Sequence, residues 1–528
     1  MKNFTLYSLA LAAVAGGASS EKVMAASEIN ADGEQTQLRK NVLMIAVDDL
    51  KPLLGCYGDS LAKTPNIDRL AERGVVFTSA YCQQAVSAAT RASLLTGWCP
   101  DRTRVWDLKT LIRSQNPDVV TLPQLFKEGG YTVAGIGKIY DPRSVDKQAD
   151  ALSWSQPFMN YEEYLNEKYE KPVMSHYQDK ETRQLYYKYR KKAEEQGLQK
   201  KNLIEKYIQE YVKPTVECAP VPDNAYTDGA VKFLAKYKSD KPFFLAVGFK
   251  KPHLPFCAPE KYWKLYQREN MPLAAYRKRA LNSPAFAYHN CGELQSYSDI
   301  PPLISFSDID NVKIPDEKAR ELIHGYYACI SYMDAQVGKV LDALKDSGEL
   351  ENTIIVLWGD HGWHLGDHGL WNKHTNFEHA THVPMLIIDP SARGKRRVTA
   401  PVEFLSIYPT VCDLAGMAKP ANLDGESLAR IVKGEKNAKV IKPYAASQYP
   451  RVGKMGYSLR DSRYRYTVWV DWRNRKLDVE KILGEELYDY EKDPNETVNV
   501  AGDPQYAAAL KQMKEYWGEY KKVRIDGM

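Results

Sequence analysis

Four short, uniformly apolar runs stand out along the chain: Asn41–Val47, Tyr131–Ile136, Phe243–Gly248 and Thr353–Trp358. An apolar run without polar alternation is typical of a parallel strand that is buried on both faces. Longer stretches with helical spacing, such as Ile67–Gly74 and His324–Leu344, lie between the runs. The pattern therefore predicts an α/β protein whose central sheet lies between helices.

A charged residue follows each of these runs within two positions, and histidine also follows two of them. The residues are Asp48-Asp49 after the first run, Lys138 after the second, Lys250, Lys251 and His253 after the third, and Asp360-His361 after the fourth. Ligands of open α/β sheets bind outside the carboxyl ends of the strands, so we expect these residues to share one site. The alternative, that polar residues merely follow strands, explains one or two such cases better than four.

The pattern changes near residue 440. Gly456–Arg460 and Tyr464–Val470 alternate in the manner of antiparallel strands, and Ala507–Tyr520 is typical of a closing helix. We therefore predict one large domain over residues 36–440 and a small α+β subdomain over residues 441–528. The segment 162–213, rich in Tyr, Lys, Glu and Gln, indicates a solvated helical insertion, with substrate contact as the alternative.

The N-terminus is typical of a secretory signal. Lys2 supplies positive charge, Phe4–Val14 is apolar and Ala15–Ser20 is small and cleavable. We expect residues 1–20 to be removed and the mature protein to be periplasmic or secreted. The apolar core is too short to span a membrane and no later segment approaches the length needed, so no membrane span is expected.

The composition excludes fewer functions than the hydrophobic pattern does. A formal charge of +5 over 528 residues is small, and the absence of a long basic run argues against a nucleic-acid partner. The eight cysteines are scattered without Cys-x-x-Cys spacing, which argues against a structural zinc site. Disulfide pairing in an oxidising compartment and burial as free thiols both remain open.

Ser87-Ala-Ala-Thr-Arg91, which runs on to Leu-Thr-Gly97, carries the strongest candidate chemistry. Serine is a favoured helix cap and the following residues form helices well. A nucleophile at a helix start would also face unpaired backbone N–H groups, where a sulfate group is stabilised. Arg91, four residues later, would lie on the same helical face.

A Ser/Cys-x-Pro/Ala-x-Arg element ahead of Leu-Thr-Gly, together with the two acidic strand ends, resembles the formylglycine-dependent sulfatases of the alkaline-phosphatase superfamily. The resemblance spans almost the whole mature chain, although Ala89 stands where Pro is commoner. It implies a sandwich of helices around a central mixed sheet. It also implies that a maturating enzyme of the serine type, as in bacteria, oxidises Ser87 to formylglycine, whose hydrate attacks sulfur.

The resemblance implies a ligand set and a cationic group. The metal ligands would be Asp48, Asp49, Ser87, Asp360 and His361. Oxygen ligands favour Ca²⁺, whereas the histidine leaves Mg²⁺, Mn²⁺ and Zn²⁺ open. Lys138, His253 and Lys373 match the remaining cationic positions: the lysines would bind sulfuryl oxygens, and His253 would protonate the leaving oxygen.

The stretch from Asp360 to Pro384 is similar to the iduronate 2-sulfatase branch, which implies a 2-O-sulfated uronic acid at the end of a glycosaminoglycan oligosaccharide. His374 and His382 are candidate substrate-binding residues. The candidates for the uronate carboxylate are Lys250, Lys251, His374 and the other histidines that follow His361, and spacing singles out none of them. His368 and His382 would line the pocket or pack its wall, whereas His364 and His379 are expected at the surface. Asp141 occupies the place of a histidine that is the presumed base in relatives, so either Asp141 or another group takes that role.

Two alternatives remain open. A phosphonate monoester or phosphodiester hydrolase of the same superfamily can use the same metal and aldehyde, and an unmatured protein could only bind glycans. The relative turnover of sulfate and phosphate esters distinguishes the first alternative. The mass of the Ser87 peptide distinguishes the second.

Overall fold

The computed structural model describes residues 27–29, 35–37, 39–159, 180–198, 215–217, 222–297, 299–301, 314–392 and 394–526. It divides into a unit of residues 1–39 and a unit of residues 40–528. In the first unit, β1 (Ser27–Ile29) pairs with β2 (Gln35–Gln37). The predicted signal sequence over residues 1–20 lies outside the described residues.

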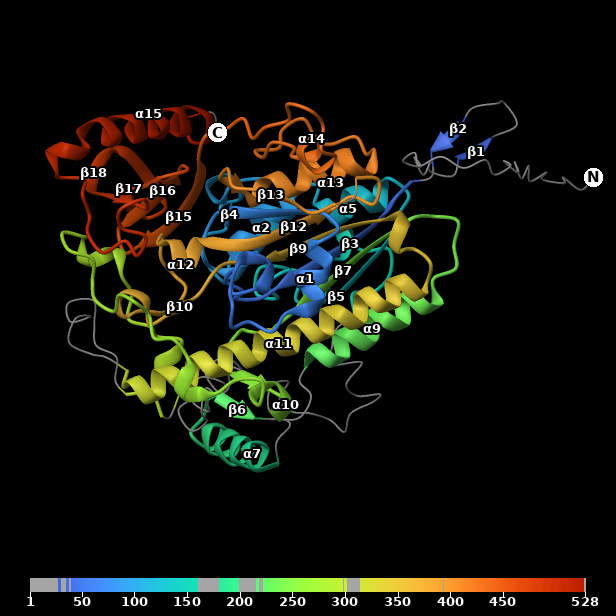
Figure 1. Ribbon diagram of the computed structural model, residues 1–528, viewed down its shortest axis with the longest axis horizontal. Helices are drawn as coiled ribbons and strands as arrows, with labels where there is room; N and C mark the ends of the chain where they lie inside the picture. The colour runs from blue at the N-terminus through green and yellow to red at the C-terminus, as the bar shows by residue number, and fades with distance from the viewer. Residues whose placement is uncertain are drawn as a thin grey trace, which may run out of the picture. The chain divides into compact units, whose positions relative to one another are not determined.

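An eight-stranded mixed sheet forms the centre of the second unit (Figure 1). Its order is β13-β4-β12-β9-β3-β7-β5, with β14 beside β4. The strands are β3 (Asn41–Val47), β4 (Val75–Tyr81), β5 (Thr132–Gly137), β7 (Phe243–Phe249), β9 (Thr353–Gly359), β12 (His382–Ile388), β13 (Arg396–Val398) and β14 (Val402–Glu403). The four predicted strands are the neighbours β9, β3, β7 and β5, and they run parallel. Their carboxyl ends therefore meet at one edge, as predicted.

Helices cover both faces of this sheet (Figure 1). One face carries α1 (Pro65–Ala71), α9 (Pro222–Lys236) and α11 (Asp316–Asp346), and the other carries α2 (Ser87–Thr96), α5 (Leu122–Glu128) and α13 (Ile407–Ala415). Leu43 and Ile45 of β3 point into the first core, whereas Val42 and Met44 point into the second. Successive strand side chains face opposite ways, which explains why β3 is apolar throughout.

An antiparallel sheet follows the central one in the chain. It consists of β15 (Ala445–Arg451), β16 (Lys454–Arg460), β17 (Tyr464–Arg473) and β18 (Lys476–Asp489), in that order. The helix α15 (Ala507–Arg524) packs on it, and Met513 and Trp517 of this helix share a separate apolar core with Met455 and Val468. This sheet is the small C-terminal subdomain that the alternating pattern predicts.

The structure shows which state several of the cysteines adopt. Cys56, Cys82, Cys99, Cys291 and Cys412 are buried free thiols. Cys82 and Cys412 belong to the core on the α2 side of the sheet, and Cys56 and Cys291 belong to the other core. These side chains therefore act as small apolar residues.

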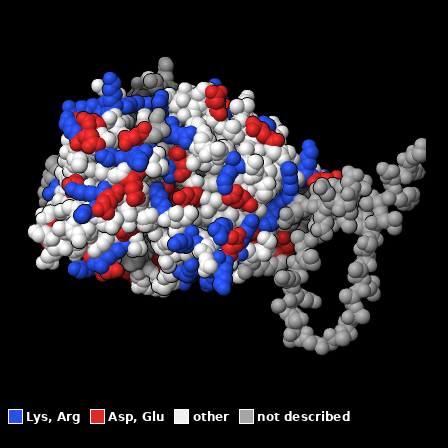
Figure 2. Space-filling model, turned by 90° about the horizontal axis from the view of Figure 1, so that it is seen from above, with Lys and Arg blue, Asp and Glu red and all other residues white. Residues whose placement is uncertain are grey.

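The surface agrees with the modest net charge. Lysine and arginine are interspersed with aspartate and glutamate on the face shown in Figure 2. Within the predicted insertion over residues 162–213 lies the helix α7 (Lys180–Glu195), and most of its side chains that the structure describes are exposed. Among the described residues, no helix combines the length and the apolar composition that a membrane span requires.

Candidate active site

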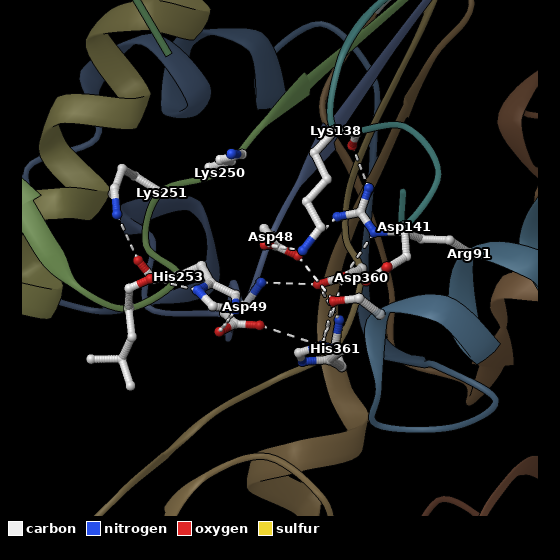
Figure 3. Close-up of polar contacts among 12 residues, drawn as sticks. Asp48, Asp49, Arg91, Lys138, Asp141, Lys250, Lys251, His253, Asp360 and His361 are labelled. Carbon is white, nitrogen blue, oxygen red and sulfur yellow. Dashed lines mark hydrogen bonds and ion pairs between the residues drawn. The ribbon is translucent and has the colours of Figure 1, made fainter. Parts of the chain in front are cut away.

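Three aspartates from two neighbouring strand ends form the centre of the site (Figure 3). Asp48 and Asp49 follow β3 and Asp360 follows β9, and all three are buried. Asp360 Oδ1 accepts hydrogen bonds from the backbone N–H groups of Asp49 at 2.9 Å and His361 at 3.0 Å. Asp49 has a φ of 57°, a left-handed conformation that aspartate adopts more readily than most residues. This turn brings the carboxylates together.

Ser87 reaches the carboxylates from the first turn of α2. Its Oγ lies 3.1 Å from Asp48 Oδ1 and 3.2 Å from His361 Nε2. The residue that caps the helix is Val86, so the interpretation of Ser87 as the cap is wrong. Ser87 instead occupies the first helical position, where the backbone N–H groups have no partner within the helix and attract anions.

Arg91 connects α2 to three strand ends. Its Nε donates to Asp360 Oδ2 at 2.9 Å, and its Nη2 donates to Asp48 Oδ1 at 3.1 Å. Its Nη1 donates to the backbone carbonyls of Lys138 and Ile139, just after β5. Burial would lower the pKa of Arg91, but Asp360 and Asp48 raise it, so the guanidinium stays charged.

The other predicted cations surround the same carboxylates. Lys138 Nζ lies 2.5 Å from Asp48 Oδ2, and Lys373 Nζ lies 3.1 Å from both carboxylate oxygens of Asp49. His253 Nε2 lies 3.8 Å from Asp49 Oδ2. Burial would raise the pKa of Asp48, but Lys138, His253 and Arg91 hold it well below its usual range.

Glu293 joins this group, although the sequence pattern gives no sign of it. Its carboxylate lies 3.0 Å from Lys373 Nζ and 3.1 Å from His253 Nε2. Burial would raise the pKa of Glu293, but Lys373 and His253 hold it well below its usual range. The residue lies in an irregular segment just before the 3₁₀ helix Leu294–Ser296, where neither periodicity nor a motif could single it out.

Asp141 is buried and paired with Arg143. The Nε and Nη2 of Arg143 donate to the two carboxylate oxygens at 2.9 and 2.8 Å, and its backbone N–H donates to Oδ1 at 3.0 Å. Burial would raise the pKa of Asp141, but these hydrogen bonds, together with Lys138 and the charge of Arg143, lower it to about 2. The carboxylate is therefore ionised, and both of its oxygens accept hydrogen bonds.

Three other candidate substrate-binding residues have partners within the protein. Lys251 Nζ donates to the carbonyls of His253 at 2.8 Å and Pro255 at 2.6 Å, so it supports the loop after β7. The ring of His374 packs against Tyr449, and burial keeps its pKa well below its usual value. His382 Nε2 lies 2.8 Å from the carbonyl oxygen of Thr78 on β4.

The histidines between residues 364 and 379 mostly pack against other residues of the protein. The prediction that His364 lies at the surface is wrong: the residue is fully buried, and its Nε2 lies 2.9 Å from Thr375 Oγ1. It lies on the hairpin of β10 (His364–Leu365) and β11 (Trp371–Asn372), which packs inward. His368 stacks on Phe377, whereas His379 is partly exposed and contacts Asp367.

The carboxylates and His361 are suited to a divalent cation. Ligand atoms of Asp49, Asp360 and His361 lie within 4.8 Å of one another, as do those of Asp48, Asp49 and His253. His361 Nδ1 lies 3.1 Å from the Gly362 carbonyl; with the hydrogen assigned to Nδ1, the Nε2 lone pair faces Asp49 Oδ1 at 3.3 Å. An imidazole in this orientation can bind a cation through Nε2 together with the Asp49 carboxylate.

The electrostatic surroundings of Asp49 also favour a bound cation. Burial raises the pKa of Asp49, even though His253, Lys373 and His361 lower it. Burial thus outweighs the positive side chains around Asp49. A cation bound by Asp49, Asp360 and His361 would supply the remaining positive charge.

A family profile described as Sulfatase matches residues 40–417, which is more than half of the chain. The chain belongs to the sulfatase family. A second profile, described as the C-terminal part of N-sulphoglucosamine sulphohydrolase, matches residues 366–522 of this sulfatase. The family and the prediction of a sulfuric ester hydrolase are thereby confirmed.

Two relatives that are similar to this sulfatase over most of its length are named for uronic acids. This sulfatase is 34% identical over 559 residues to iduronate 2-sulfatase of Mus musculus, and the match covers 93% of this chain and 96% of the relative. It is 27% identical over 509 residues to a Delta 4,5-hexuronate-2-O-sulfatase of Bacteroides thetaiotaomicron, covering 92% and 89% of the two chains.

Two solved structures share its fold. A 2-O GAG sulfatase superposes with a TM-score of 0.62 at 24% identity over 92% of each chain. A phosphonate monoester hydrolase of Agrobacterium radiobacter superposes with a TM-score of 0.67 at 23% identity, over 92% of this chain and 96% of the hydrolase. The predicted sandwich around a mixed sheet, with its C-terminal subdomain, is confirmed.

Proposed function

We propose that this sulfatase removes the 2-O-sulfate of a terminal uronic acid in glycosaminoglycan oligosaccharides. The observation that carries the proposal is the contact of Ser87 Oγ with Asp48 and His361, at carboxylates that Lys138, Lys373 and His253 also contact. Relatives named for 2-O-sulfate hydrolysis support the choice of sugar.

Two groups would complete the site. Formylglycine, made from Ser87 by a serine-type maturating enzyme, would as its hydrate supply the nucleophile that attacks sulfur. Asp48, Asp49, Asp360, His361 and the oxygen of residue 87 would hold Ca²⁺, which would supply positive charge beside the sulfuryl oxygens.

The other residues of the chain neutralise charge and move a proton. Lys138 and Lys373 provide fixed positive charge on the two sides of the aspartates, where a sulfuryl group gains negative charge as the ester bond breaks. Both ring nitrogens of His253 face oxygen acceptors, Leu254 O at 2.6 Å and Glu293 at 3.1 Å. This arrangement fits an imidazolium that donates its Nε2 proton to the leaving sugar oxygen.

Maturation is tested by the mass of the peptide that contains Ser87. Protein from a host with a serine-type maturating enzyme is expected to carry residue 87 lighter by two hydrogen atoms, because oxidation of the hydroxymethyl group gives an aldehyde. A fully active, homogeneous preparation with intact serine would contradict the proposed nucleophile. That result would leave the family assignment untouched.

The substrate is tested with disaccharides that differ only in the position of the sulfate. We expect 2-O-sulfate on a terminal uronosyl residue to be released faster than 6-O- or N-sulfate on glucosamine. Preference for a glucosamine or galactosamine sulfate would contradict the uronate assignment. Phosphonate monoester or phosphodiester hydrolysis is the second candidate, because the phosphonate monoester hydrolase shares the fold; a higher kcat/KM for aryl phosphonates or phosphodiesters than for aryl sulfates would establish it.

A further inference from the structure

Arg143 is an exposed arginine held in one orientation by a buried carboxylate. About half of its side chain is exposed, at 55%, whereas Asp141 is fully buried. The pairing uses two of the five N–H groups of the guanidinium. Among the described residues, Asp141 is the only hydrogen-bond acceptor for this side chain, so the other N–H groups are available to a ligand.

The loop after β5 places Arg143 beside the active site, because Arg91, which contacts Asp48 and Asp360, also donates to the carbonyl of Ile139, two residues before Asp141. Burial would lower the pKa of Arg143, but Asp141 raises it, and so do Asp48 and Glu293. Asp48 contacts Ser87 and Lys138, and Glu293 contacts Lys373 and His253. The charges of Asp48 and Glu293 thus act on Arg143, although Arg143 contacts neither carboxylate.

We propose that Arg143, oriented by Asp141, binds the carboxylate of the uronic acid whose 2-O-sulfate is removed. This proposal rests on the proposed function and adds a residue that recognises the substrate. A planar guanidinium can offer two parallel N–H groups to a carboxylate, and prior orientation by Asp141 reduces the entropy lost on binding. In this proposal Asp141 is a positioning residue rather than the base.

The other cations near the site are less suited to this carboxylate. Lys138 and Lys373 already pair with Asp48 and Asp49, and Lys251 donates to backbone carbonyls. Burial and the charge of Lys138 lower the pKa of Lys250 to about 8, so Lys250 loses its positive charge in mildly alkaline solution. Arg143 keeps its charge at every relevant pH.

The test compares kcat/KM of the matured enzyme and its Arg143→Ala variant on three substrates. These are a 2-O-sulfated uronosyl disaccharide, its carboxyl methyl ester, and an aryl sulfate without a carboxylate. We expect the variant to lose about tenfold more on the acid than on the ester or the aryl sulfate, mainly through KM, because a charge-assisted pair is lost. Arg430→Ala, an exposed arginine paired with Glu435, is the matched control.

Asp141→Asn supplies the second variant. It is expected to reduce the preference for the acid over the ester, and Arg143→Ala is then expected to add little in its background, because the two residues act as one unit. Equal losses on all three substrates, or no loss on the acid, would overturn the proposal.

Inhibition separates this proposal from the substrate assignment. Aryl sulfate turnover is measured with the desulfated uronosyl disaccharide and with its methyl ester as inhibitors. Stronger inhibition by the acid in wild type, but not in Arg143→Ala, supports the contact even if the enzyme cleaves another sulfate position. Equal inhibition by acid and ester in wild type overturns the contact even if the uronosyl 2-O-sulfate proves to be the substrate.

Discussion

Asp49 is the side chain on which the charges of the site depend most. Lys373 and His361 contact its carboxylate, at 3.1 and 3.3 Å, and His253 lies 3.8 Å away. Its backbone N–H donates to Asp360, and its carbonyl accepts a hydrogen bond from Tyr326 at 2.6 Å. The residue is thus held on both sides, so a change of its charge alters electrostatics before it alters geometry.

Asp49→Asn is expected to lower turnover of an aryl sulfate by at least about 10², because the amide is a weak cation ligand and Lys373 keeps only one of its two charged partners, Glu293. Metal content, measured by mass spectrometry after gel filtration, is expected to fall in parallel, while the far-UV circular dichroism stays that of wild type. Asp413→Asn, a surface residue paired with Lys419, is the control. Full wild-type activity after exhaustive chelation would contradict the role of the carboxylates as metal ligands.

The helix α2 is the element that brings the nucleophile to the strand ends. All of its residues from Ser87 to Thr96 are buried, so it cannot move without disturbing the core on its side of the sheet. Its only charged residue, Arg91, holds the ends of β3 and β9 and the loop after β5. The position of Ser87 relative to the carboxylates therefore depends on this guanidinium.

Arg91→Met is expected to destabilise the protein by about 3–5 kcal/mol, because it leaves Asp48 and Asp360 buried with less compensation. Arg91→Lys is expected to recover only part of this loss, since an ammonium group cannot reproduce the fork of donors. Urea unfolding with and without added Ca²⁺ measures both effects, and Ca²⁺ is expected to offset part of the loss. Arg430→Met on the surface should change the unfolding free energy by less than about 0.5 kcal/mol; a similar small change for Arg91→Met would refute this role of Arg91.

At the scale of the whole molecule, buried histidines make the stability of the fold depend on pH. Burial lowers the pKa of His289 to about 3 and that of His364 well below its usual value. Both side chains are therefore neutral in the folded state, whereas the unfolded chain binds protons below a pH of about 6.5. Since the unfolded state takes up more protons, acid favours unfolding.

We expect the unfolding free energy to fall as pH drops below about 6.5, with a slope of up to about 1.4 kcal/mol per pH unit for each such histidine. Urea unfolding at a series of pH values between neutral and mildly acidic measures this slope. In the wild type the backbone N–H of Cys291 donates a hydrogen bond to His289 Nδ1 at 2.9 Å. His289→Asn keeps an acceptor for this N–H and removes one titrating group. This variant is expected to show a shallower slope, and a slope equal to that of wild type would falsify the assignment to His289.

The sequence by itself determined the sheet and most of the reactive centre. Strands buried on both faces are apolar throughout, so β3, β7 and β9 are visible as runs, and parallel neighbours necessarily share one carboxyl edge. The residues directly after these strands, together with the Ser87 motif, could therefore be grouped before any contact was known.

Only the tertiary structure decided which other side chains join that centre. Glu293 reaches it from an irregular segment, Arg143 is oriented by a buried partner, and Lys251 turns to backbone carbonyls. His364 is buried because its hairpin packs inward. These outcomes depend on loop paths and on contacts between distant segments, and such contacts leave no period in the sequence because each is made once.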